Sequence, residues 1–173
     1  DMISSARHII FWSLPMMALF VVLRAQIVRT ILGAGNFSWS DTRLTAACLA
    51  VFTLSVASQS LLLLFVRGYY ALGKTFKPLL INVVSSALIV LFGYVGLRLY
   101  EIQPNFHLFL ESLLRVDNLS GNAVLILPLA YTLGMIVNMV WHWISFERDF
   151  RGFTGAVSKT LFASFSASVI IGY

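Results

Sequence analysis

The 173-residue chain is too apolar for a water-soluble domain, because hydrophobic residues make up 59% of it and charged residues 11%, against roughly 45–50% and about 25% in soluble proteins. Its net charge of +5 comes from basic residues scattered between apolar runs, which argues against a nucleic-acid-binding arm. The single cysteine, Cys48, excludes a disulfide framework. We therefore expect lipid to be the solvent of this chain.

Long apolar segments predict membrane-spanning helices, since about 20 such residues are needed to cross ~30 Å of hydrocarbon. Four segments are complete, at residues 9–32, 44–66, 78–97 and 119–146, and a fifth, 158–173, is still apolar at the last residue. The first residue is Asp1 rather than Met, so we expect a piece of a larger protein. The predicted fold is all-α, a polytopic transmembrane helix bundle with four complete spans and a truncated fifth.

Two connections between these spans have predictable features. Ser38 or Ser40 is placed to cap the second span, with Asp41 favourable in its first turn. The second connection is marked by Arg67, Gly68, Gly73, Lys74 and Lys77.

The connection between the third and fourth spans is long enough to hold a helix. Apolar residues recur with helical spacing over 106–115, at Phe106, Phe109, Leu110, Leu113 and Leu114, with His107, Glu111, Ser112 and Arg115 opposite. This pattern predicts a short amphipathic helix. It lies either on the outer membrane surface or against the protein itself.

The distribution of Lys and Arg predicts the orientation. With the N-terminus in the cytoplasm, the cytoplasmic side holds Arg7, Arg67, Lys74, Lys77, Arg148, Arg151 and Lys159, and the opposite side holds Arg29, Arg43, Arg98 and Arg115. Cytoplasmic loops carry the excess of basic residues in membrane proteins. The sequence therefore favours a cytoplasmic N-terminus.

Arg24 is the most informative single residue. It lies about one turn beyond the middle of the first span, where a charge costs roughly 2.5–3.5 kcal/mol, and its side chain leans back into the membrane. We expect it to face a cavity or a partner. Gln26, Arg29 and Gln59 are further cavity candidates, although a phosphate contact at the membrane surface also explains Arg29 and helix packing also explains Gln59. Pro15 is a hinge candidate because proline kinks a helix.

Other polar residues have simpler interpretations. All seven carboxylates lie in loops or at helix ends, so we predict neither a buried proton relay nor a metal site. Glu147 and Asp149 fit a solvated charged loop. His142, between Trp141 and Trp143, fits the belt of aromatic side chains at a membrane surface.

An ordered series of short motifs resembles a known family. It consists of Leu14-Pro15, Ile27-Val28-Arg29, Gly35-Asn36-Phe37, Ser40-Asp41, Thr45-Ala46 and Leu49, then Arg67-Gly68-Tyr69-Tyr70-Ala71-Leu72-Gly73-Lys74-Thr75 with Pro78. Over residues 7–90 this series is similar to the MurJ (MviN) lipid II flippases. The run from Arg67 to Pro78 resembles that family's "FYA…DT…P" loop, and it makes Arg67, Tyr69, Tyr70, Lys74 and Pro78 a cytoplasmic loop motif.

The resemblance implies a two-lobe transporter of fourteen helices in the bacterial inner membrane, of which this chain supplies helices nine to twelve and the start of thirteen. Such a protein moves lipid II, the undecaprenyl-pyrophosphate-linked peptidoglycan precursor, to the outer leaflet by alternating access. Arginines are expected to clamp the pyrophosphate. The implied partners are lipid II, membrane lipids and the peptidoglycan synthesis machinery. No cofactor is implied, and the membrane potential or an ion gradient supplies the energy.

Some features depart from the family pattern. Its principal cavity arginines belong to helices before this segment, residues 87–93 are apolar where some members bind an ion, and the third connection is longer. Two alternatives stay open. One is another exporter of the same multidrug/oligosaccharidyl-lipid/polysaccharide superfamily, with a different lipid-linked oligosaccharide or an organic cation as substrate. The other is a membrane glycosyltransferase or a scaffold.

Overall fold

The computed structural model describes residues 2–33, 38–114, 121–150 and 152–172. The helices in these ranges are α1 (Met2–Leu32), α2 (Trp39–Ala71), α3 (Phe76–Ile102), α4 (Pro104–Leu114), the 3₁₀ turn η1 (Asn122–Leu125), α5 (Ile126–Asp149) and α6 (Phe153–Gly172). Within the described ranges, five helices are long and apolar enough to cross a membrane, namely α1, α2, α3, α5 together with η1, and α6. The predicted all-α bundle is confirmed.

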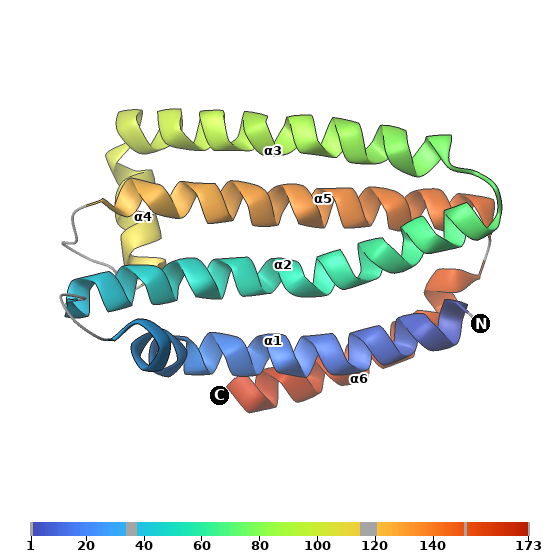
Figure 1. Ribbon diagram of the computed structural model, residues 1–173, viewed down its shortest axis with the longest axis horizontal. Coiled ribbons are helices and arrows are strands. Elements are labelled where there is room, and N and C mark those ends of the chain that lie inside the picture. The colour runs from blue at the N-terminus through green and yellow to red at the C-terminus, as the bar shows by residue number, and fades with distance from the viewer. Residues whose placement is uncertain (1, 34–37, 115–120, 151, 173) are drawn as a thin grey trace.

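The long helices run side by side in the order α3, α5, α2, α1, and α6 packs on α1 (Figure 1). α5 packs against both α2 and α3, whereas α2 and α3 hardly touch each other. The N-terminus, the α2–α3 turn and the α5–α6 turn meet at one end, here called the N-terminal end (Figure 1). The end of α1, the start of α2 and α4 lie at the opposite end, here called the α4 end (Figure 1).

The helix bounds differ from the predicted spans most clearly between α2 and α3. The predicted second connection was wrong in extent, because α2 continues through Arg67 to Ala71 and α3 begins at Phe76. Gly68 leaves room for the Met2 side chain of α1, since a Cβ there would lie 2.5 Å from the Met2 sulfur. α6 also begins before the predicted residue 158. Residues 34–37, 115–120 and 173, which include the Gly35-Asn36-Phe37 motif and Arg115, lie outside the described ranges.

The start of α2 has the predicted cap. The Ser38 hydroxyl accepts a hydrogen bond from the Asp41 amide (3.2 Å), and the Asp41 carboxylate accepts one from the Ser38 amide (3.0 Å). This reciprocal pair is a capping box. It confirms Ser38, rather than Ser40, as the cap of the second long helix.

Small residues bring α3 and α5 close together. A Cβ on Gly134 of α5 would collide with the Ile89 side chain of α3, and a Cβ on Gly93 would lie 3.8 Å from the Ala130 Cβ. Glycine and alanine allow helix backbones to approach closely in a membrane, where packing rather than exclusion of water holds helices together. The α3–α5 pair is therefore tightly packed.

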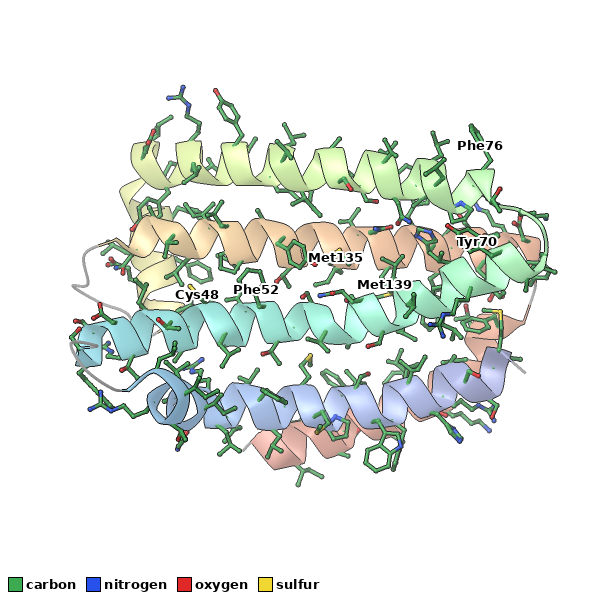
Figure 2. All side chains as sticks on the ribbon, viewed as in Figure 1. Cys48, Phe52, Tyr70, Phe76, Met135 and Met139 are labelled. Atoms are coloured by element: carbon green, nitrogen blue, oxygen red, sulfur yellow. The ribbon has the colours of Figure 1, made fainter. Side chains whose placement is uncertain are left out.

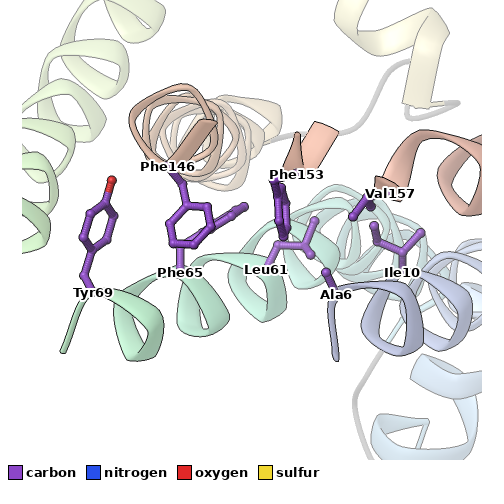
Figure 3. Close-up of a cluster of buried hydrophobic side chains, with 8 residues drawn as sticks. All are labelled: Ala6, Ile10, Leu61, Phe65, Tyr69, Phe146, Phe153 and Val157. Atoms are coloured by element: carbon purple, nitrogen blue, oxygen red, sulfur yellow. The ribbon is translucent and has the colours of Figure 1, made fainter. Parts of the chain in front are cut away.

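A cluster of buried side chains joins four helices toward the N-terminal end. Its members are Ala6 and Ile10 of α1, Leu61, Phe65 and Tyr69 of α2, Phe146 of α5, and Phe153 and Val157 of α6 (Figure 3). The Phe65 ring lies 5.5 Å from the rings of both Phe146 and Phe153. Aromatic pairs at this separation add to the energy of packing. This four-helix core fixes α1, α2, α5 and α6 relative to one another.

The predicted amphipathic helix is present as α4, which crosses the bundle at a steep angle to the long helices (Figure 1). Glu111, on the predicted polar face, is buried against the protein. The Glu111 carboxylate accepts a hydrogen bond from the Asn122 amide group at 2.5 Å. A buried carboxylate needs such a partner, so the polar side of α4 is turned toward the protein here.

Candidate functional site

Two hollows follow one another along the same face of α2. The first, here called the α1–α2 cavity, has a volume of about 530 Å³. Its lining is mostly apolar and comes from three helices: Ser13, Met16, Met17 and Phe20 of α1, Leu49, Phe52, Thr53, Ser55, Val56 and Gln59 of α2, and Tyr131 of α5. Figure 2 shows Phe52 between α2 and α5, where its ring lies 5.7 Å from that of Tyr131.

The second hollow, here called the α2–α3 groove, has a volume of about 550 Å³. It exists because α2 and α3 stand apart on either side of α5, and Met135 of α5 contributes to its lining (Figure 2). The other lining residues are Val56, Gln59, Ser60, Leu62, Leu63 and Val66 of α2 and Asn82 of α3. The groove therefore has polar side chains on both of its walls.

Gln59 lines both hollows. Its amide nitrogen donates a hydrogen bond to the Ser55 hydroxyl at 2.8 Å, which holds the side chain on the polar side of α2. The other lining residue that they share is Val56. The structure thus places one predicted cavity candidate at the junction of two hollows.

Arg24 lies on the face of α1 that carries the lining of the α1–α2 cavity. It is half-buried and follows Phe20 by four residues and Met17 by seven, spacings that share one side of a helix. Val28, one turn further along, is buried. Within the described ranges no hydrogen bond or ion pair joins Arg24 to another residue. Arg24 thus lies one turn beyond Phe20, the last α1 residue of the cavity lining.

Gln26 and Arg29 are exposed and line neither hollow. Arg29 instead reaches across to the start of α2, where its guanidinium lies 3.5 Å from the Thr42 hydroxyl and 5.5 Å from the Trp39 ring centre. The structure therefore brings Arg24 and Gln59 toward the same side of α1 and α2, and it leaves Gln26 and Arg29 outside that region.

Pro15 lies within an unbroken α1 and lines a smaller hollow between α1 and α6. Because proline has no amide hydrogen, the carbonyl of Phe11, four residues earlier, lacks its usual helical donor. A hinge at this position stays a prediction.

The predicted cytoplasmic loop motif is divided between helix ends. Tyr69 and Pro78 are buried, while Arg67 and Tyr70 are exposed, and Lys74 is the one motif residue in the turn itself. Tyr69 belongs to the four-helix core. The motif therefore anchors the α2–α3 turn at least as much as it presents side chains to a partner.

Asp149 joins this turn to the end of α5. Its carboxylate lies 2.7 Å from the Lys77 ammonium and 3.9 Å from that of Lys74, and the Lys77 ammonium is 5.6 Å from the Tyr69 ring centre. Asp149 is exposed, as the interpretation of a solvated charged region implies, and the structure adds these two lysines as its partners.

Glu147 also has a structural role that the sequence interpretation missed. Its carboxylate accepts hydrogen bonds from the Gly152 amide (2.9 Å), the Thr154 amide (2.8 Å) and the Thr154 hydroxyl (2.9 Å). An acid that bonds the free amides at a helix start is stabilising. The signal available in the sequence was an acidic residue shortly before the last apolar run.

His142 is completely buried, so the membrane-surface belt was the wrong explanation for it. Its Nδ1 lies 3.0 Å from the Asn138 carbonyl, and the Asn138 side chain donates to the Asn82 side chain at 3.0 Å. The Asn138–Asn82 bond joins α5 to α3 beside the α2–α3 groove, which Asn82 lines. Within the described ranges no three His, Cys, Asp or Glu side chains gather as a metal site.

Comparison with known proteins adds one finding to this geometry. A model of the family described as "Lipid II flippase MurJ" matches residues 1–173. No curated protein and no solved structure matches the chain.

Proposed function

The chain belongs to the MurJ family of lipid II flippases, and we propose that its α1–α2 side forms part of the wall along which lipid II crosses the membrane. As a member of this family it is a multi-pass membrane transporter that acts in peptidoglycan synthesis. Its substrate class is the lipid-linked peptidoglycan precursor. The proposal concerns how the described helices take part in that transport.

The observation that carries the proposal is the position of Gln59. Lipid II joins a polyprenyl tail to a pyrophosphate and a disaccharide-peptide, and the charged part cannot cross ~30 Å of hydrocarbon unaided. Gln59 supplies an amide to both hollows beside α2, in a span that is otherwise largely apolar. Such a group can exchange hydrogen bonds with sugar hydroxyls or amides as they pass.

Arg24 supplies the charge that a pyrophosphate requires. A guanidinium presents a planar set of donors that binds phosphate oxygens in pairs. Arg24 lies one turn beyond the cavity residues Met17 and Phe20 on the same face of α1, and it is half-buried. We assign it the role of holding the pyrophosphate at this end of the path.

We place the chain in the bacterial inner membrane with its N-terminal end in the cytoplasm. The basic side chains of Arg7, Lys74 and Arg148 belong to the helix ends that meet there (Figure 1). The positive-inside rule supports this orientation. Transport then proceeds by alternating access, without a bound cofactor, and the membrane potential or an ion gradient drives it.

The experiment compares variants of the full-length protein in its membrane. Arg24→Ala and Gln59→Ala are tested against Gln26→Ala, a control on an exposed face of α1. Appearance of lipid II in the outer leaflet is measured, together with the amount of inserted protein. We expect Arg24→Ala to slow translocation by about tenfold or more, because a hydrogen bond to a charged group is worth about 1.5–3 kcal/mol.

Arg24→Lys keeps the charge and loses the paired donors, so an intermediate rate is expected. A wild-type rate for Arg24→Ala, or equal losses for Arg24→Ala and Gln26→Ala, would remove Arg24 from the path. Equally fast movement of an undecaprenyl-linked oligosaccharide without the peptide would instead favour the exporter of a different lipid-linked oligosaccharide.

A further inference from the structure

α4 lies at the level where the long helices reach the membrane surface. It begins two residues after the end of α3 and runs across the start of α5 (Figure 1). The last turns of α3 carry Tyr94, Arg98 and Tyr100, and the Arg98 guanidinium stacks 5.6 Å from the Tyr94 ring centre. Tyrosine and arginine gather where hydrocarbon meets water. The axis of α4 is therefore close to the plane of the membrane.

One side of α4 is fixed to the protein by specific contacts. Glu111 bonds Asn122 at the start of the fourth long helix, and Leu114 packs against the buried pair Ala47 and Leu125. Because a buried carboxylate is costly without its partner, the Glu111–Asn122 bond opposes rotation of α4 about its own axis. As a consequence, the side of α4 opposite to Glu111 and Leu114 is held facing away from the protein.

That opposite side is rich in large apolar residues. Phe109 and Leu113 are each 59% exposed, and Leu108, which lies three residues before Glu111 and so at the edge of this side, is 60% exposed. Asn105 and Ser112 are also exposed. Leu127 in the first turn of α5 is also exposed, so the lipid-facing surface of a long helix lies at the same level. In water such a surface is unfavourable, whereas the boundary between headgroups and acyl chains accepts this mixture of side chains.

We propose that α4 is an interfacial helix that inserts Leu108, Phe109 and Leu113 into the lipid leaflet at the α4 end of the bundle. The partner is the leaflet itself, because the helix lies in its plane, at its depth, and with its apolar side directed away from the protein. α4 is then bound to lipid on one side and to α5 on the other. It sets the depth of the tightly packed α3–α5 pair in the membrane.

The test measures the surroundings of α4 directly in the full-length protein in lipid vesicles. With native cysteines such as Cys48 replaced, single spin labels are placed at Phe109 and Leu113. Two controls are matched for exposure: Thr75 in the α2–α3 turn for water, and Val90 in the middle of α3 for hydrocarbon. Relaxation by oxygen, which concentrates in lipid, is compared with relaxation by a water-soluble nickel chelate.

We expect the oxygen-to-nickel ratio at Phe109 and Leu113 to be several times that at Thr75 and below that at Val90. A ratio equal to that at Thr75 would place this side of α4 in water. Low access to both reagents would place it against protein, whether another part of the full chain or a partner. Either result overturns the proposal, and neither bears on the transport of lipid II. Labels at Leu108 repeat the measurement, and size-exclusion chromatography confirms that each variant is folded.

Discussion

Substitution of Gly134 by alanine tests whether α3 and α5 pack as closely as the structure shows. The added Cβ would collide with the Ile89 Cγ1 and would lie 3.2 Å from the Ile89 Cβ. The Cβ is bonded directly to the backbone of α3, so rotation of the Ile89 side chain does not relieve both contacts. The two helices must separate locally, and their other contacts weaken with them.

The expected loss is the difference between two effects. Overpacking of a close interface costs about 1–3 kcal/mol, and replacement of glycine by alanine inside a helix returns up to about 1 kcal/mol. We therefore expect Gly134→Ala to lower the free energy of unfolding by about 1–2 kcal/mol. Ile89→Ala removes the Cγ1 and Cδ1 contacts and keeps only the Cβ contact at 3.2 Å, so in that background the same substitution is expected to cost clearly less.

Thermal unfolding of the full-length protein in detergent, followed by size-exclusion chromatography, measures both effects. Gly93→Ala is the matched control on the same interface, because its Cβ would meet the Ala130 Cβ at 3.8 Å, an ordinary contact. It should be neutral or stabilising. If Gly134→Ala leaves the stability unchanged, or lowers it equally in the wild-type and the Ile89→Ala backgrounds, the close packing that we infer is refuted.

Two further predictions concern the N-terminal end and the proline in α1. Asp149→Asn removes the 2.7 Å contact with Lys77 and should lower the free energy of unfolding by less than about 1 kcal/mol, and by less still at high salt, because both side chains are partly exposed. Glu101→Gln, at a side chain that is mostly exposed, is the control. A loss of stability that does not depend on salt would contradict an ion pair. Pro15→Ala supplies the missing donor for the Phe11 carbonyl. We therefore expect a change in the ratio of inward-accessible to outward-accessible transporter, measured by cysteine labelling. An unchanged ratio rules out a hinge at this position.

The number and type of the long helices were predictable because each depends on a local property, a run of about 20 apolar residues. Their ends were not, since hydropathy shows where the hydrocarbon ends rather than where the helix ends. α2 continues beyond Val66 through Arg67, Gly68 and Tyr69, where the glycine leaves room for Met2 and the tyrosine ring is buried in the four-helix core. Both contacts are with parts of the chain distant in sequence.

The same distinction separates the polar residues whose contacts could be predicted from the sequence from those whose contacts could not. Ser38 and Asp41 are three residues apart, so their capping box was visible in the sequence. Asp149 instead pairs with Lys77, 72 residues away, and the burial of His142 depends on the helices that pack against α5. Charge and aromatic neighbours alone gave no information about either partner.

Gln59 is the clearest case of a residue whose surroundings could not be predicted from the sequence. From the sequence, helix packing was the default interpretation of this residue and a cavity position was a candidate, because a single amide in an apolar span serves both purposes. The α2–α3 groove exists because α5 packs between its two walls, and α5 is held to α2 by the bond from Thr132 to the Val51 carbonyl (2.9 Å) and to α3 by the bond from Asn138 to Asn82. These contacts join residues 56 to 81 positions apart. Gln59 becomes a residue shared by two hollows only through that arrangement.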